Sequence, residues 1–260
     1  MASQNTNELE LLQIWFKEMD KPLHQYEEPI LEESSLKILK IACDTFKQDI
    51  HVFITSIEVL EEYIRRKLKN EETLYDEVLI LATSIFISSK YTGELIDLKI
   101  KYIIKFLQKL TNVDYQYKII TATEIEILRT LGGSLPLATI VDDINTVIEL
   151  HVRESRLKAN VRPLCLEILQ LIYICRKRWF TELKNLYCQN EDSFLVFKFL
   201  MVNRLYIPVV VLITSLHLTN YKHILDIHSV INDITQFSKI HSDHLNILAG
   251  IMINLIRKNC

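Results

Sequence analysis

The sequence predicts an all-α protein built from two consecutive helical bundles. Apolar residues recur every three to four positions through most of its 260 residues, and no stretch shows the sustained alternation of a strand. Glycine and proline are scarce, with 4 and 5 residues, while 49% of the residues are hydrophobic, so the chain can bury a sizeable core. A break formed by Gly132, Gly133 and Pro136 divides this helical pattern into two halves.

The first half contains five amphipathic segments, preceded by an extra helix. Asn7 can cap that extra helix, and Lys21-Pro22 ends it. The five predicted segments are 36–46, 53–68, 75–90, 95–110 and 115–131. The expected organisation is an N-terminal helix and linker over 1–33, a first bundle over 34–138 and a second bundle over 139–260.

The second half is predicted to hold about five more helices. Thr139 can cap the first of them, with Asp142 in its first turn. Pro208 is expected to break or kink the third at Ile207, or to begin a new helix. The predicted segments are 140–151, 161–187, 194–218, 223–237 and 241–257.

Composition limits the compartment and the partners. The net charge of −3 argues against a domain whose main task is to neutralise phosphates, so direct nucleic-acid binding is not expected. The five cysteines are scattered without a Cys-x-x-Cys pair, as in reduced proteins of the cytosol or nucleus. The most apolar stretch, 206–218, is shorter than the roughly 18 residues of a membrane span. We expect a soluble, intracellular protein that does not contact a membrane.

No pattern for catalysis stands out. With only 4 glycines, no phosphate-binding glycine loop can be assembled, so we expect no enzyme and no cofactor. The pair His241 and His244 favours helix capping over a metal site, because no further ligands are evident. Asp142-Asp143 is typical of a helix start rather than of a catalytic pair. His223 and His228 are five positions apart, which does not place them on one helix face.

Lys90 and Glu124 are the candidate binding residues. Lys90 ends a line of core positions in its helix, whereas Glu124 lies on an apolar face beside Ile120 and Ile127. A carboxylate among apolar neighbours needs a cation or hydrogen-bond donors, so Glu124 is expected to have a specific partner. The alternative is that Lys90 only complements the end of its helix, with Gly93 as a left-handed cap, while Glu124 extends into solvent.

Two basic runs, 65–69 and 176–178, are interpreted as solvated helix ends because acidic residues interrupt or flank each of them. Trp179 and Phe180 follow the second run. They are expected to be anchors of the core or of an interface, and they are the candidate residues for a second partner-binding surface.

Three segments of the first half resemble the cyclin box. They are SIEVLEEY at 56–63, LATSIFISSK at 81–90 and TEIEILRTLG at 123–132, similar to the second, third and fifth helices of the box; LPLAT at 135–139 resembles the linker that follows it. The resemblance implies a non-enzymatic regulator with a cyclin-like fold. It also implies that Lys90 and Glu124 bind the regulatory C helix of a cyclin-dependent kinase.

Within the cyclin family, residues 57–61 and the stretch 164–186 are similar to a meiotic crossover factor. This resemblance implies crossover maturation in meiotic nuclei, on chromosomes, with recombination and mismatch-repair-type proteins as partners; a cytoplasmic pool stays open. Acids and serines at 31–35 replace the apolar docking motif of cell-cycle cyclins, so docking of Arg-x-Leu substrates is not expected. The alternatives are a cyclin-fold scaffold for recombination or transcription proteins that activates no kinase, and a DNA binder of the transcription-factor-B type.

Overall fold

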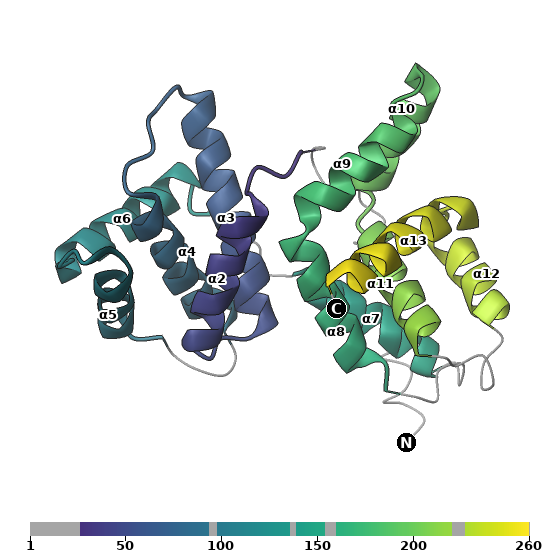
Figure 1. Cartoon of the computed structure of the whole chain (residues 1–260), viewed down its shortest axis with the longest axis horizontal. Helices are drawn as coiled ribbons and strands as arrows, with labels where there is room; N and C mark the ends of the chain where they lie inside the picture. The colour runs from purple at the N-terminus through teal and green to yellow at the C-terminus, as the bar shows by residue number, and fades with distance from the viewer. Residues whose placement is uncertain (1–26, 94–97, 136–138, 154–159, 220–226, 260) are drawn as a thin grey trace, which may run out of the picture. The chain divides into compact units, whose positions relative to one another are not determined.

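The computed structural model describes residues 27–93, 98–135, 139–153, 160–219 and 227–259. Regular secondary structure in these ranges is entirely helical, which confirms the all-α prediction (Figure 1). The helix predicted after Asn7 lies outside the described residues. The structure divides into two compact units, Pro29–Thr139 and Ile140–Cys260, and Glu28 belongs with the second.

Unit Pro29–Thr139 is built around one buried helix. Its helices are α2 (Glu33–Thr45), α3 (Ile50–Lys69), α4 (Glu77–Thr92), α5 (Ile100–Thr111) and α6 (Tyr117–Thr130). Every residue of α4 from Leu79 to Ser89 is buried, because the other four helices of the unit all pack against it. A helix that is apolar on all sides belongs in the interior, and this position makes α4 the centre of the unit.

Local capping explains where α4 starts and ends. Asp76 accepts a hydrogen bond from Leu79 N at 3.0 Å, so the helix begins at Glu77 and not at Tyr75. At the other end Gly93 is extended, with φ −69°, so the left-handed cap considered there is wrong. A Cβ at Gly93 would lie 2.6 Å from Ser89 O, so glycine is needed for space.

The break predicted at Gly132 and Gly133 follows directly after the end of α6. Gly132 and Gly133 have φ of +69° and +70°, a region that other residues rarely adopt. Gly133 N donates to Leu128 O at 2.9 Å and closes the end of α6. Helix α5 starts at Ile100, later than the predicted 95, and residues 94–97 lie outside the described ranges.

Unit Ile140–Cys260 is also built around one buried helix, which is α11 (Tyr206–Leu218). Its described helices are α7 (Ile140–Arg153), α8 (Arg162–Ile174), α9 (Arg176–Tyr187), α10 (Glu191–Val202), α11 (Tyr206–Leu218), α12 (Ile227–Ser238) and α13 (Ser242–Asn259). Helix α11 is buried from Pro208 to Leu216 and packs against α7, α8, α12 and α13. Each unit therefore surrounds one apolar helix with amphipathic ones.

Two predicted segments of the second half are each two helices, so the described residues of this unit hold seven helices instead of about five. The segment 161–187 is interrupted at Cys175, where the backbone leaves helical geometry. The segment 194–218 bends by 85° between α10 and α11. Pro208 does not cause this bend: it lies in the first turn of α11, where its missing N–H removes no helical hydrogen bond.

Among the described helices, none alone has both the length and the apolar character needed to cross a membrane. Only α10 and α11 taken together reach that length and composition, and they are sharply bent.

Candidate partner-binding site

The structure brings Lys90 and Glu124 together. Lys90 projects from the last turn of α4, and Glu124 comes from the middle of α6, which packs against α4. The Lys90 Nζ and Glu124 Oε1 atoms are 2.6 Å apart. Glu124 therefore has the specific partner that its apolar surroundings required, and that partner is Lys90.

The pair is only partly buried. The Glu124 side chain is 13% exposed and the Lys90 side chain 39% exposed. The Lys90 Nζ atom also lies 4.0 Å from the centre of the Phe86 ring, a cation–π contact that supports the position of the ammonium group. An ammonium group has three donors, so Lys90 can hold Glu124 and still donate to a second molecule.

Apolar side chains are exposed next to both charges. Tyr91 follows Lys90 and is 52% exposed, and Ile125 follows Glu124 and is 43% exposed. Apolar area gives binding energy, whereas a partly desolvated charge pair gives register and specificity. The pair therefore has exposed apolar side chains as its neighbours in sequence.

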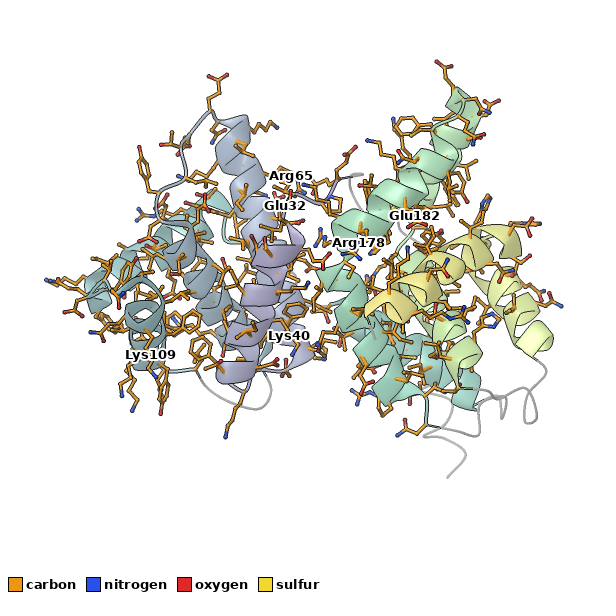
Figure 2. The ribbon with its side chains drawn as sticks, viewed as in Figure 1. Glu32, Lys40, Arg65, Lys109, Arg178 and Glu182 are labelled. Carbon is orange, nitrogen blue, oxygen red and sulfur yellow. The ribbon has the colours of Figure 1, made fainter. Side chains whose placement is uncertain are left out.

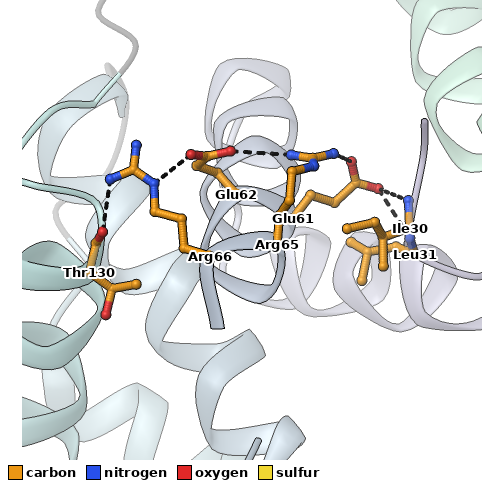
Figure 3. Close-up of polar contacts among 7 residues, drawn as sticks. All are labelled: Ile30, Leu31, Glu61, Glu62, Arg65, Arg66 and Thr130. Carbon is orange, nitrogen blue, oxygen red and sulfur yellow. Dashed lines mark hydrogen bonds and ion pairs between the residues drawn. The ribbon is translucent and has the colours of Figure 1, made fainter. Parts of the chain in front are cut away.

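A second charged cluster lies on α3, and its role is internal (Figure 3). Glu61 is 3% exposed, and its Oε1 accepts hydrogen bonds from Ile30 N and Leu31 N, both at 3.1 Å. The carboxylate thus holds in place the irregular segment that leads into α2. The sequence placed Glu61 only in a helix pattern, because its partners lie 30 residues away in an irregular segment.

The basic run at 65–69 lies at the end of α3, as predicted, and Lys69 is exposed, but Arg65, Arg66 and Lys67 are partly buried and paired with acids. Arg66 Nε lies 2.6 Å from Glu62 Oε1, and Arg66 also donates to Thr130 O at 2.8 Å. Arg65 lies 3.2 Å from Glu62 Oε2 (Figure 3). Arg66 therefore connects α3 to the end of α6, whereas the contacts of Arg65 with Glu61 and Glu62 lie within α3.

Lys67 completes this connection between α3 and α6. Its Nζ lies 2.7 Å from both Glu126 and Glu72, and Tyr63 OH donates to Glu126 at 2.9 Å. The hydrogen bonds from Lys67 lower the pKa of Glu126 and of Glu72. Burial, then the hydrogen bond to Glu126, raise the pKa of Tyr63 to about 12.

Trp179 and Phe180 are core residues of their unit, 7% and 4% exposed. Trp179 Nε1 donates to Ile172 O at 3.0 Å, and the Phe180 ring packs edge-on against Phe197 at 5.5 Å. Of the two roles expected for these residues, the structure shows the core anchor. Binding of a partner by these rings stays a prediction, and it would need a surface formed by their neighbours.

Asp142 and Asp143 lie in the first turn of α7, as the sequence predicted, and Asp143 has a further role. Its side chain is 4% exposed and accepts two hydrogen bonds from Arg204, at 2.6 and 2.7 Å. This bidentate pair joins α7 to the segment between α10 and α11. Sequence reasoning missed it because Arg204 lies 61 residues away and stands alone in an apolar stretch.

His244 contacts the side chain of Tyr187. Its Nδ1 lies 2.5 Å from Tyr187 OH, and its backbone oxygen accepts from Tyr206 OH at 3.1 Å. His241 Nδ1 lies 3.3 Å from Asp243. No group of three or more metal-binding side chains converges among the described residues, and the pair His223 and His228 falls where side chains are not described.

No model of a known protein family matches this chain, and no curated protein matches it either. The residues and their geometry are therefore the basis for a functional assignment.

Proposed function

We propose that this chain is a cyclin-type regulatory protein that binds a cyclin-dependent kinase and promotes the maturation of meiotic crossovers. The observation on which the proposal rests is the Lys90–Glu124 pair, 2.6 Å apart on two packed helices. Support also comes from the five-helix unit α2–α6, in which four helices surround the buried α4, and from the resemblance of three of the five to the cyclin box. The protein would act by binding in the nucleus, not by catalysis.

In this proposal Lys90 and Glu124 meet the kinase while they also meet each other. The partly exposed ammonium group donates to acceptors of the kinase helix, and Glu124 holds that ammonium group in place. Tyr91 and Ile125, the residues that follow Lys90 and Glu124 in the sequence, supply exposed apolar area for binding. Recombination and mismatch-repair-type proteins would be further partners of the same complex.

The test is co-purification with candidate cyclin-dependent kinases. Lys90→Glu and Glu124→Lys are each expected to reduce the retained kinase at least tenfold, since each leaves two like charges facing one another. The double variant Lys90→Glu/Glu124→Lys restores the internal pair but reverses both charges toward the partner. We therefore expect it to fold normally and still to lose the kinase.

A matched control uses the partly exposed pair Glu33 and Lys37 on α2, 2.7 Å apart. Reversal of these two charges should leave kinase binding unchanged. Full kinase binding by either single variant, or by the double variant, would show that Lys90 and Glu124 only stabilise the fold.

A second candidate function, a scaffold without kinase activation, has its own observation. Leu195 and Phe199 lie four residues apart on α10 and are 62% and 54% exposed, and Leu186 on α9 is 51% exposed. Exposed apolar residues on one helix face are typical of a protein-binding surface. A recombination or transcription partner could be bound here, over the core that contains Trp179 and Phe180.

One variant distinguishes the kinase-binding function from the scaffold function. The variant Leu195→Ser/Phe199→Ser should lose the scaffold partner in a pull-down while kinase activity in the same extract is unaffected. If this variant loses neither partner, the scaffold surface is not on α10.

A further inference from the structure

Helix α5 has an unusual charge composition. Lys101, Lys105 and Lys109 are all exposed, and no carboxylate occurs within Ile100–Thr111. Among the described helices, α5 is the one that combines three cations with no acid. We call Lys101, Lys105 and Lys109 the lysine face.

The lysine face follows one side of α5, with each lysine turned by about 40° around the axis from the one before. Its members are spaced four residues apart, which places them on one side of the helix and about 6 Å from one another along its axis. The opposite side of α5 contains Ile103 and Leu107, which are fully buried. Tyr102 lies beside the row, 47% exposed, and its ring centre is 5.1 Å from Lys101 Nζ. Figure 2 shows Lys109 extending from α5 into open space.

These charges oppose the stability of the helix that holds them. Like charges at positions i and i+4 repel each other, and this occurs twice along the row. Lys101 also lies in the first turn, where the helix dipole is positive and an acid is favoured. No ion pair joins any of the three lysines to a described residue. Helix stability therefore does not explain the row.

The spacing of the row selects the kind of anion. In an extended peptide, side chains on the same side repeat every second residue, or about 6.6 Å. This repeat matches the roughly 6 Å interval of the lysines. We propose that the lysine face of α5 is a docking surface for an extended acidic segment of a partner protein, with carboxylates at alternate positions and Tyr102 packing against the residues between them.

A peptide fits this surface better than a nucleic acid does. The row is only about 12 Å long, so a nucleic acid would run past it onto a chain whose net charge is −3 with these lysines included. An acidic segment of about five extended residues is as long as the row. The proposal does not depend on Lys90 and Glu124, which lie on other helices.

The experiment measures binding of a fluorescein-labelled peptide, three glutamates alternating with threonines, to the full chain by fluorescence anisotropy at 50 mM salt. The variant Lys101→Gln/Lys105→Gln/Lys109→Gln should bind about tenfold more weakly, since three exposed ion pairs are lost. The control Lys69→Gln/Lys198→Gln/Lys258→Gln removes the same charge from exposed lysines elsewhere, and it should bind within twofold of the unchanged chain.

Two more comparisons make the outcome decisive. A peptide with its three glutamates consecutive should bind at least threefold more weakly than the alternating peptide. The α5 variant should melt at a slightly higher temperature than the unchanged chain, because the repulsion is gone, and this shows that it is folded. Equal weakening by both triple variants would overturn the proposal, as would tighter binding of a single-stranded oligonucleotide than of the peptide. If Lys90→Glu loses the kinase but still binds the peptide, the lysine face is a binding surface separate from the Lys90–Glu124 pair.

Discussion

At the scale of single residues, three buried or half-buried acids of this protein each have a different task. Glu61 caps backbone N–H groups, Asp143 holds an arginine, and Glu124 holds a lysine that stays accessible. The exposure of the partner separates these tasks: Arg204 is 23% exposed, whereas Lys90 is 39% exposed. An accessible cation is the feature that makes the Lys90–Glu124 pair a candidate for recognition.

Replacement of Glu61 tests its role as a backbone cap. Glu61→Ala should lower the free energy of unfolding by about 2–3 kcal/mol, because Ile30 N and Leu31 N lose their acceptor. Glu62→Ala on the same helix should cost about 1 kcal/mol or less, since its arginine partners are more exposed. Urea denaturation of both variants measures the difference, and equal losses would contradict the capping role.

Asp143 offers a second residue-scale test. Asp143→Asn should lower the free energy of unfolding by about 2–4 kcal/mol, because it leaves the guanidinium of Arg204 without its counter-charge. Partial exposure of Arg204 to water limits this loss. The double variant Asp143→Leu/Arg204→Met removes both charges and should cost less than Asp143→Asn alone. Thermal unfolding of the three proteins decides between a paired and an incidental contact.

At the scale of elements, contacts between distant helices set the geometry that periodicity could not. Residues 161–187 and 194–218 each have the apolar spacing of one helix, yet each is broken. The first break coincides with Cys175, and the bond from Trp179 Nε1 to Ile172 O spans it. At the second break Asn203 Oδ1 accepts from Leu205 N at 2.9 Å, which stabilises a turn before α11.

The junction of α9, α11 and α13 is expected to depend on pH. Burial and the neighbouring His241 lower the pKa of His244 below its usual 6.5, although Asp243 acts in the opposite direction. Because the folded state prefers neutral His244, the unfolded state binds the proton more readily. The stabilisation from this group is complete above pH 6.5 and is lost as pH falls through the lower folded pKa.

Melting temperatures at pH 7.5 and pH 5.5 measure this effect. The unchanged chain should lose more stability between these values than the variant His244→Gln, whose amide oxygen can accept from Tyr187 OH and does not titrate. Parallel losses in the two proteins would assign the pH dependence to other groups.

At the scale of the whole molecule, each unit has a core of its own. Helix α4 is covered by α2, α3, α5 and α6, all from Pro29–Thr139, and α11 by helices of the other unit. The Lys90–Glu124 pair and the lysine face both belong to the first unit. Both proposed binding surfaces therefore depend on the packing around α4.

A fragment covering residues 27–139 is expected to fold by itself. It retains the buried helix, the four helices that cover it and the backbone groups that Glu61 caps. Circular dichroism should show helical content and one cooperative thermal transition. A fragment without a cooperative transition would mean that the second unit is required for the first to fold.

Local patterns in the sequence were enough to predict the helical class, the glycine break after α6 and the position of Lys90 and Glu124 on core helices. These features follow from local rules: apolar spacing of three to four residues, the left-handed preference of Gly132 and Gly133, and the need of an apolar-facing carboxylate for a partner. The packing of the helices was needed to show that the partner of Glu124 is Lys90, and that Asp143 binds Arg204 across 61 residues. The physical reason is that a side chain's neighbours within a helix are set by its period, whereas its neighbours across helices depend on how all the helices pack together.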